Sequence, residues 1–363
     1  MKNIFLRGLK LGLILNLSSI VFAVFYIFAV ETQLTKPLDK FSLPLKLGTI
    51  VTSDRVYFKN SIKQRDSWSR IFKQFSFFAV ENELRTDYLK PTRLLNWCPN
   101  QECFAHRIGY TDIRKQQFKY FTLDDWWANN KYFTVKDTAA DELQLTQFLK
   151  TLPDGSLIVI SEPFSIFAER RSLAKFLEWA LVLRSQHPKL KFEIGLQVHL
   201  QWIDAWWVRY RWLLPEFEKF SKKYSYPWGV SEFSNYDRTW KLRINRPSFV
   251  DSAFYQTDGF ALDPLRQAII LHYFYRIFYQ IEGLVLLRLR RAIVLHQTYQ
   301  LHRDAVHYGA VRFVEWGNFQ HTAWFVNQID AAYESNYLLF DASGEPTDLW
   351  WAAMRGLKDG KIE

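Results

Sequence analysis

The chain contains very little cysteine, which limits the kinds of site that it can build. Cys98 and Cys103 are the only two cysteines among 363 residues. A structural zinc site normally needs four ligands, so this pair is too small for one. In an oxidising compartment the two side chains would close a small loop as a disulfide, and two free thiols are the alternative.

The sequence also lacks internal repeats, low-complexity tracts and long basic runs. Its net charge is nevertheless +10, from 47 basic and 37 acidic residues. That charge favours anionic surroundings such as an acidic polysaccharide or a membrane surface. Because no nucleic-acid-binding motif accompanies it, we predict no nucleic-acid partner. Nothing in the sequence identifies a protein partner.

Aromatic residues, in contrast, are abundant. They make up 18% of the chain and include 15 tryptophans. Aromatic rings fill protein cores, and they also stack on the apolar faces of sugar rings. The excess therefore fits a carbohydrate-binding cleft as well as an oversized core.

The N-terminus predicts export. Basic residues precede residues 11–30, which carry no charge and are long enough to span a bilayer as a helix. The basic flank stays inside, so the rest of the chain lies on the exported side, periplasmic or extracellular. The alternative is a signal peptide cleaved after residues 21–23, which would release a secreted protein. The apolar run continues beyond that point, which favours an uncleaved signal anchor over residues 1–30.

After a linker at residues 31–46, short β-branched or aromatic runs alternate with amphipathic segments. This alternation is typical of the α/β class, with βα units around a parallel sheet. Residues 104–122 alternate differently and fit a hairpin as well as a strand–helix–strand unit. The clearest predicted strands are residues 47–51, 75–80, 157–160, 192–198, 229–232 and 311–316.

Residues 284–296 combine apolar side chains with three arginines. Each arginine at the centre of a membrane span would cost several kcal/mol, so a second span is disfavoured. The segment predicts a packed helix with a basic face. A membrane-surface contact close to the anchor is the alternative.

Two of the predicted strands run out into a glutamate, Glu162 after residues 157–160 and Glu232 after residues 229–231. In a (β/α)8 barrel the C-terminal strand ends carry the chemistry. Two carboxylates that face one pocket are the minimum equipment of a glycoside hydrolase. Two ordinary glutamates that cap neighbouring helices are the alternative.

Several segments in the right order resemble glycoside hydrolase family 10, the endo-β-1,4-xylanases. The similar segments are residues 47–50, 78–85 with Glu81 and Asn82, 194–200 with Gln197 and His199, 230–233 with Glu232, 313–324 with Trp316 and Trp324, and 338–341. The resemblance implies one (β/α)8 TIM barrel over residues 47–355, followed by a C-terminal tail at residues 356–363. Together with the predicted anchor, it implies a membrane-anchored, exported glycoside hydrolase that acts on a β-linked polysaccharide.

The same resemblance implies a retaining mechanism, with Glu232 as the nucleophile and Glu162 as the acid/base. This chemistry needs no metal and no cofactor. The substrate-binding residues that it implies are Glu81, Asn82, Arg85, His106, Gln197, His199, Trp316 and Trp324. For His199 the alternative is a satisfied core histidine, for Glu81 and Asn82 a helix cap, and for the tryptophans a place in the core.

The sequence departs from the family pattern at several positions. Arg85, Thr86, Ser234 and Gln320 stand where the family has Lys, Trp, Asp and Asp. These departures favour the alternative of a catalytically degenerate barrel, which binds glycans or assists polysaccharide assembly or export at the membrane.

The middle of the chain is also irregular. The family's fourth strand ends in Asn-Glu, and Glu162 is the candidate for that glutamate. Between Glu162 and Gln197, however, there is one helix and no separate fifth strand. Either one βα unit is missing or irregular, or residues 157–160 form the fifth strand and the fourth lies near residues 118–121. In the second case Glu162 is displaced from the acid/base position.

Overall fold

The computed structural model describes residues 2–51, 71, 73–80, 102–106, 119–124, 138–163, 170–200, 212–235, 288–315, 339–340 and 344–361. In α1 the side chains are described from Ser18 on, and in β3 only the course of the backbone is described.

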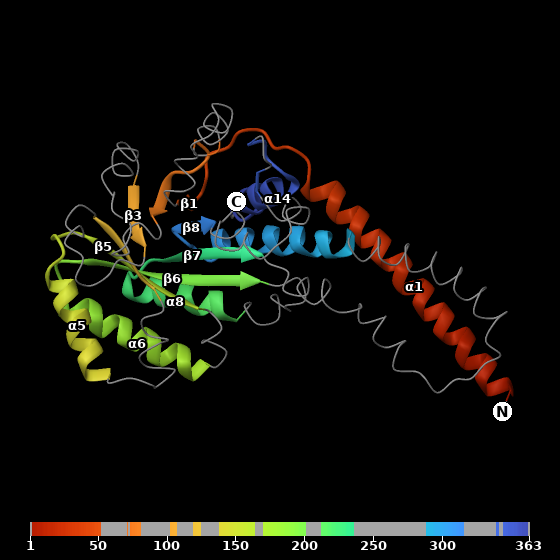
Figure 1. The fold of residues 1–363 in the computed structure, drawn as a ribbon, viewed down its shortest axis with the longest axis horizontal. Helices are drawn as coiled ribbons and strands as arrows, with labels where there is room; N and C mark the ends of the chain where they lie inside the picture. The colour runs from red at the N-terminus through yellow and green to blue at the C-terminus, as the bar shows by residue number, and fades with distance from the viewer. Residues whose placement is uncertain are drawn as a thin grey trace, which may run out of the picture.

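Eight parallel strands close into a barrel in the order in which they follow along the chain (Figure 1). The last strand pairs with the first, with Lys46 in register with Arg312, and this pairing closes the sheet. The predicted barrel is therefore confirmed. The strands are β1 (Lys46–Val51), β2 (Phe77–Val80), β3 (Glu102–His106), β4 (Tyr120–Asp124), β5 (Leu157–Pro163), β6 (Lys191–Leu200), β7 (Trp228–Asn235) and β8 (Arg312–Glu315).

The structure decides between the two interpretations of the middle of the chain. Tyr120 of β4 is in register with Leu157 of β5, and β5 pairs in turn with β6. Residues 157–160 therefore belong to the fifth strand, and no strand is missing from the barrel. The hairpin considered for residues 104–122 is wrong, because β3 and β4 are parallel. A parallel pair needs a crossover connection instead of a tight turn.

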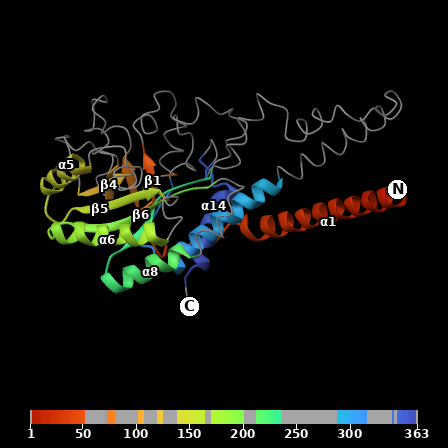
Figure 2. The ribbon, with the colours of Figure 1, turned by 90° about the horizontal axis from the view of Figure 1, so that it is seen from below.

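The described helices cover the outside of the barrel (Figures 1 and 2). They are α5 (Thr138–Lys150), α6 (Arg170–Gln186), α8 (Leu213–Tyr224), residues 288–307 and α14 (Asp348–Asp359). The helix α14 continues past residue 355, and its residues Gly356 and Leu357 are buried.

The helix α8 illustrates how these elements pack. Its buried side chains Leu213, Leu214, Phe217 and Phe220 recur with helical spacing, and the Phe217 ring stacks on Trp228 of β7 at 5.8 Å. Each such side chain contributes about 1.5–3 kcal/mol when fully buried. The helix ends where Ser225 adopts the left-handed conformation, with φ 49°, and turns the chain into β7.

Strand residues alternate between the lumen and the outer face of the barrel. The outer face packs against the helices and forms the larger core. The lumen holds a smaller cluster, made of Phe77, Ala79, Leu157, Val159 and Val314. Near the N-terminal ends of the strands, the Arg312 guanidinium donates to the Glu193 carboxylate at 2.9 Å and lies over the Phe77 ring. The lumen is thus a filled core, as expected for a barrel of eight strands.

The first helix, α1 (Lys2–Leu34), packs along the barrel with its C-terminal part. Ala23, Ile27, Val30 and Leu34 are buried, and this spacing places them on one helix face. The Tyr26 hydroxyl is hydrogen-bonded to His296 Nδ1 at 2.7 Å. The helix therefore continues past the predicted anchor into the predicted linker. Over the residues that the structure describes, no helix is both long enough and apolar enough to cross a membrane.

One buried histidine makes the stability of the barrel depend on pH. His187 follows α6, and its Nε2 has no hydrogen-bond partner among the described residues. Burial, together with the nearby Lys150, lowers the pKa of His187 below 6.5. The unfolded chain therefore binds this proton more readily than the folded one. The stability that the neutral ring provides is complete above the unfolded pKa and is lost as the pH falls through the folded pKa.

We expect His187→Gln to lose less unfolding free energy than the wild type between about pH 7 and about pH 5. The reason is that the glutamine takes up no proton in this range. Urea unfolding at the two pH values measures the difference. Equal losses in the two proteins would contradict the role assigned to His187.

Candidate active site

A polar layer crosses the lumen near the C-terminal ends of β5, β6 and β7. The Ser161 and Ser231 hydroxyls are hydrogen-bonded at 2.9 Å, and Gln197 Nε2 donates to Ser161 Oγ at 3.1 Å. All three residues are buried. Gly195 makes this approach possible, because a Cβ atom there would lie 2.6 Å from the Ser231 Cβ. The apolar lumen therefore changes into a hydrogen-bonded layer at this level.

An extra residue in β7 determines which way Glu232 faces. Leu196 is in register with Val230, but the next residue of β6, Gln197, is in register with Glu232. Ser231 is thus the inserted residue of a β-bulge, a feature that re-aims side chains. Glu232 shares the row of Gln197, whose amide bonds Ser161 inside the lumen. Without the bulge, strand alternation would turn Glu232 outward.

The residue after Glu232 faces the outside of the barrel. Phe233 is in register with Val198, which belongs to the outer core. Its ring meets Phe313 at 5.6 Å and His302 at 5.7 Å, both edge-on. Glu232 is therefore a fully buried carboxylate on the lumen side, held by a strand whose next side chain is fixed in the outer core.

Glu162 occupies a different place. It lies on β5, as in the second of the two placements considered, and so is displaced from the end of the fourth strand. Glu162 is in register with Leu196 of the outer core, whereas the preceding Ser161 faces the lumen. Strand alternation therefore places the buried Glu162 on the outer face of the sheet, opposite to the face of Glu232.

The fourth strand ends instead at Asp124, which is in register with Ser161. Asp125 follows it in the sequence. Both aspartates belong to a run of charged and aromatic residues, 124–127, and such a run is also typical of a solvated loop. Counting the strands identifies this position, because the strand that ends at Asp124 is the fourth.

The other predicted site residues are placed less completely. His106 ends β3 in register with Thr122, and His199 of β6 is in register with Ser234, but their side chains lie outside the described residues. Glu81, Asn82, Arg85, Trp316 and Trp324 lie wholly outside them, as does Cys98. Of the predicted set, the structure thus brings Gln197 and Glu232 together.

A buried pair behind β8 was not expected from the sequence. His302 Nε2 lies 2.8 Å from Glu315 Oε1, and its Nδ1 lies 2.8 Å from the Thr298 carbonyl oxygen. The imidazole stacks on Phe313 at 3.9 Å. Glu315 is the last residue of β8, and the Thr49 hydroxyl of β1 donates to its carbonyl oxygen at 2.9 Å. The pair therefore ties the end of β8 to a surrounding helix.

Neither a known protein family nor a curated protein matches the chain in sequence. Solved structures do match it. An endoxylanase of family 10 from a sugarcane soil metagenome has 13% identity and a TM-score of 0.51, over 87% of this chain and 97% of that one. The fold is that of the family 10 xylanases.

A second match has the same TM-score. It is Xylanase10C from Cellvibrio japonicus, solved as a mutant in complex with xylopentaose. It has 11% identity and a TM-score of 0.51, over 86% of this chain and 67% of that one. At such low identity the likeness shows the fold alone. This likeness of fold agrees with the resemblance to family 10 that the ordered sequence segments indicate.

We expect His302→Leu to lower the unfolding free energy by about 3–5 kcal/mol, since it removes a partner of the buried Glu315 carboxylate. His302→Gln should lose clearly less, because its amide nitrogen can still donate to that carboxylate. Urea unfolding measures both variants. If the two lose the same amount, the hydrogen bond to Glu315 contributes nothing beyond the packing of the ring.

Proposed function

We propose that the barrel hydrolyses a β-linked polysaccharide and that Glu232 is its nucleophile. The observation that carries this proposal is the bulge at Ser231. It presents a buried carboxylate to the lumen near the C-terminal end of β7, beside Gln197. Barrel enzymes place their chemistry at this end of the strands. The order of the family 10 segments in the sequence and the fold of the xylanases also support it.

In a retaining hydrolysis the nucleophile attacks the anomeric carbon while an acid protonates the leaving oxygen. Water then releases the glycosyl group from the enzyme, with the second carboxyl group acting as the base. Glu232 must be ionised and well oriented for the first step. Its position in the polar layer of Ser161, Gln197 and Ser231 suits this task.

We propose that the proton donor comes from the end of β4, at Asp124 or at Asp125 after it, instead of from Glu162. The family pattern has its acid/base at the end of the fourth strand, and β4 ends at Asp124. Glu162 lies on the opposite sheet face from Glu232, so a substrate bound in the lumen mouth would not reach it. For Glu162 a structural role in the outer core remains.

One observation favours a second candidate function. The glutamate predicted to be the acid/base does not face Glu232, which is what a barrel that binds glycans without cleaving them would show. In that case the polar layer and the aromatic residues would hold a glycan during its assembly or export. Both candidate functions require that the barrel binds a glycan, but only the first requires that it cleaves the glycan.

Three amide variants separate these candidates on xylo-oligosaccharides and aryl β-xylosides. We expect Glu232→Gln to lower kcat by about 1000-fold or more while glycan binding persists. Asp124→Asn should slow natural glycosides by about 100-fold or more, with little effect on substrates that have good leaving groups. Glu162→Gln should show no such dependence on the leaving group.

Initial rates and binding by calorimetry measure these effects. A wild-type chain that binds the oligosaccharides without cleaving them would establish the binding function instead. A leaving-group dependence in Glu162→Gln alone would return the proton donor to Glu162.

We also propose that α1 anchors the barrel on the exported side of a membrane. Residues 11–30 are uncharged and follow a basic flank. On the part of α1 with described side chains, Phe22, Phe25 and Phe28 are 74%, 70% and 69% exposed. Contiguous exposed aromatic side chains on a soluble surface are unusual, and lipid contact explains them.

We expect the wild-type chain to resist carbonate extraction and to keep its N-terminus. Phe22→Asp with Phe25→Asp should move it into the soluble fraction, because acidic side chains are costly to bury in a membrane. Leu143→Asp on α5, which is exposed as well, is the control and should change nothing. An N-terminal sequence beginning near Val24 would show that the segment is a cleaved signal peptide.

A further inference from the structure

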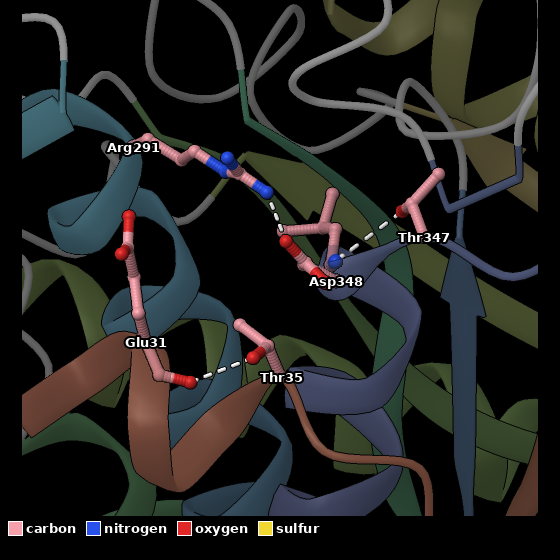
Figure 3. Close-up of polar contacts among 6 residues, drawn as sticks. Glu31, Thr35, Arg291, Thr347 and Asp348 are labelled. Atoms are coloured by element: carbon pink, nitrogen blue, oxygen red, sulfur yellow. Dashed lines mark hydrogen bonds and ion pairs between the residues drawn. The ribbon is translucent and has the colours of Figure 1, made fainter. Parts of the chain in front are cut away.

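The direction in which α1 leaves the barrel is fixed by its contacts. The strands β7 and β8 are parallel, so residues 288–307, which lie between them, run from the C-terminal rim of the barrel back to its base. The helix α14 runs the same way, because Arg291 near the rim end of residues 288–307 forms an ion pair with Asp348 at the start of α14 (Figure 3).

The C-terminal end of α1 lies toward the base of the barrel. Arg355, in the second half of α14, donates to the Lys36 carbonyl oxygen at 3.3 Å. Closer to the N-terminus, Tyr26 meets His296 in the middle of residues 288–307. The remaining N-terminal part of α1 projects on the side to which β6 and β7 point (Figure 1). That is the side of the candidate active site.

The surface at this end has the character of a membrane contact. The exposed Phe22 precedes Ala23, the first buried residue of α1, and Phe25 lies on the exposed face of the helix. Arg288 is exposed at the rim end of residues 288–307. Exposed apolar and cationic side chains toward the same end of the barrel suit the boundary between acyl chains and anionic headgroups.

We infer that the C-terminal rim of the barrel faces the bilayer in which α1 is held, and that its substrate is a β-linked glycan attached to a lipid by one end. This inference rests on the proposed anchor and on the proposed glycan function. A rim that faces the bilayer is close to a glycan whose first sugar is held at the membrane surface. A free polymer must first enter the space between the barrel and the membrane. The docked face of α1 holds this orientation, since Ile27, Val30 and Leu34 are buried in the barrel's outer core.

Photo-crosslinking of the full chain in phosphatidylglycerol vesicles tests the orientation. Phe22, Arg288 and Lys189 are replaced one at a time by p-benzoylphenylalanine. Lys189 is the matched control, since it is a solvent-exposed cation at the base, where α6 leads into β6. We expect lipid adducts from positions 22 and 288 and none above background from position 189.

The other outcomes separate the proposals. Adducts from positions 22 and 189 without 288 would overturn the orientation and leave the anchor intact. Adducts from position 22 alone would overturn it as well. No adduct from any position would overturn both the anchor and the orientation.

Glycan capture tests the substrate class. Glu232→Gln, which should bind without turnover, is reconstituted with a β-1,4-xylotetraose that is either lipid-linked or free. We expect the lipid-linked tetraose and a longer lipid-linked chain to be captured to the same extent. The free tetraose should be captured less than either. Capture of the long chain alone, or equal capture of the free sugar, would overturn the inference. If no glycan is captured in any form, the glycan function itself fails, whatever the crosslinks show.

Discussion

The insertion of Ser231 into β7 is the constraint on which the candidate active site depends. Side chains on a strand alternate between two faces, so a single added residue reverses the direction of those that follow it. In this barrel the reversal carries Glu232 to the lumen side and returns Phe233 to the outer core. Gly195 accommodates the inserted serine on the neighbouring strand. The orientation of the carboxylate is thus a property of the backbone.

Two side-chain pairs brace the short strand β8 at its ends. Arg312 begins the strand and pairs with Glu193 in the lumen, and Glu315 ends it and pairs with His302 behind the sheet. Each pair joins β8 to a different element, β6 in one case and residues 288–307 in the other. Buried pairs are poor sources of stability but are strongly destabilising when one partner is lost. They fit a strand of four residues whose register must be unique for the barrel to close.

The fold was largely predictable, because family segments in the right order along the chain constrain a barrel far more than any one of them. The strand number of residues 157–160 was not, since β4 consists of five residues in an aromatic region and has no distinctive pattern of its own. The direction of Glu162 followed from its neighbours in register, and sequence alone does not give register. The bulge at Ser231 has no sequence signature here, so Glu232 was identified from its motif and not from its geometry.

The pairing of β1 with β8 has a consequence for how the protein is made. The two strands lie at opposite ends of the sequence, and α14 adds its final contacts when Trp350 packs against Phe75. Contacts between such distant segments form late in folding. A chain exported as it is synthesised would therefore cross the membrane with its barrel still open. With the proposed anchor, its first helix would be in the bilayer before its last strand exists, so closure would take place beside the membrane surface.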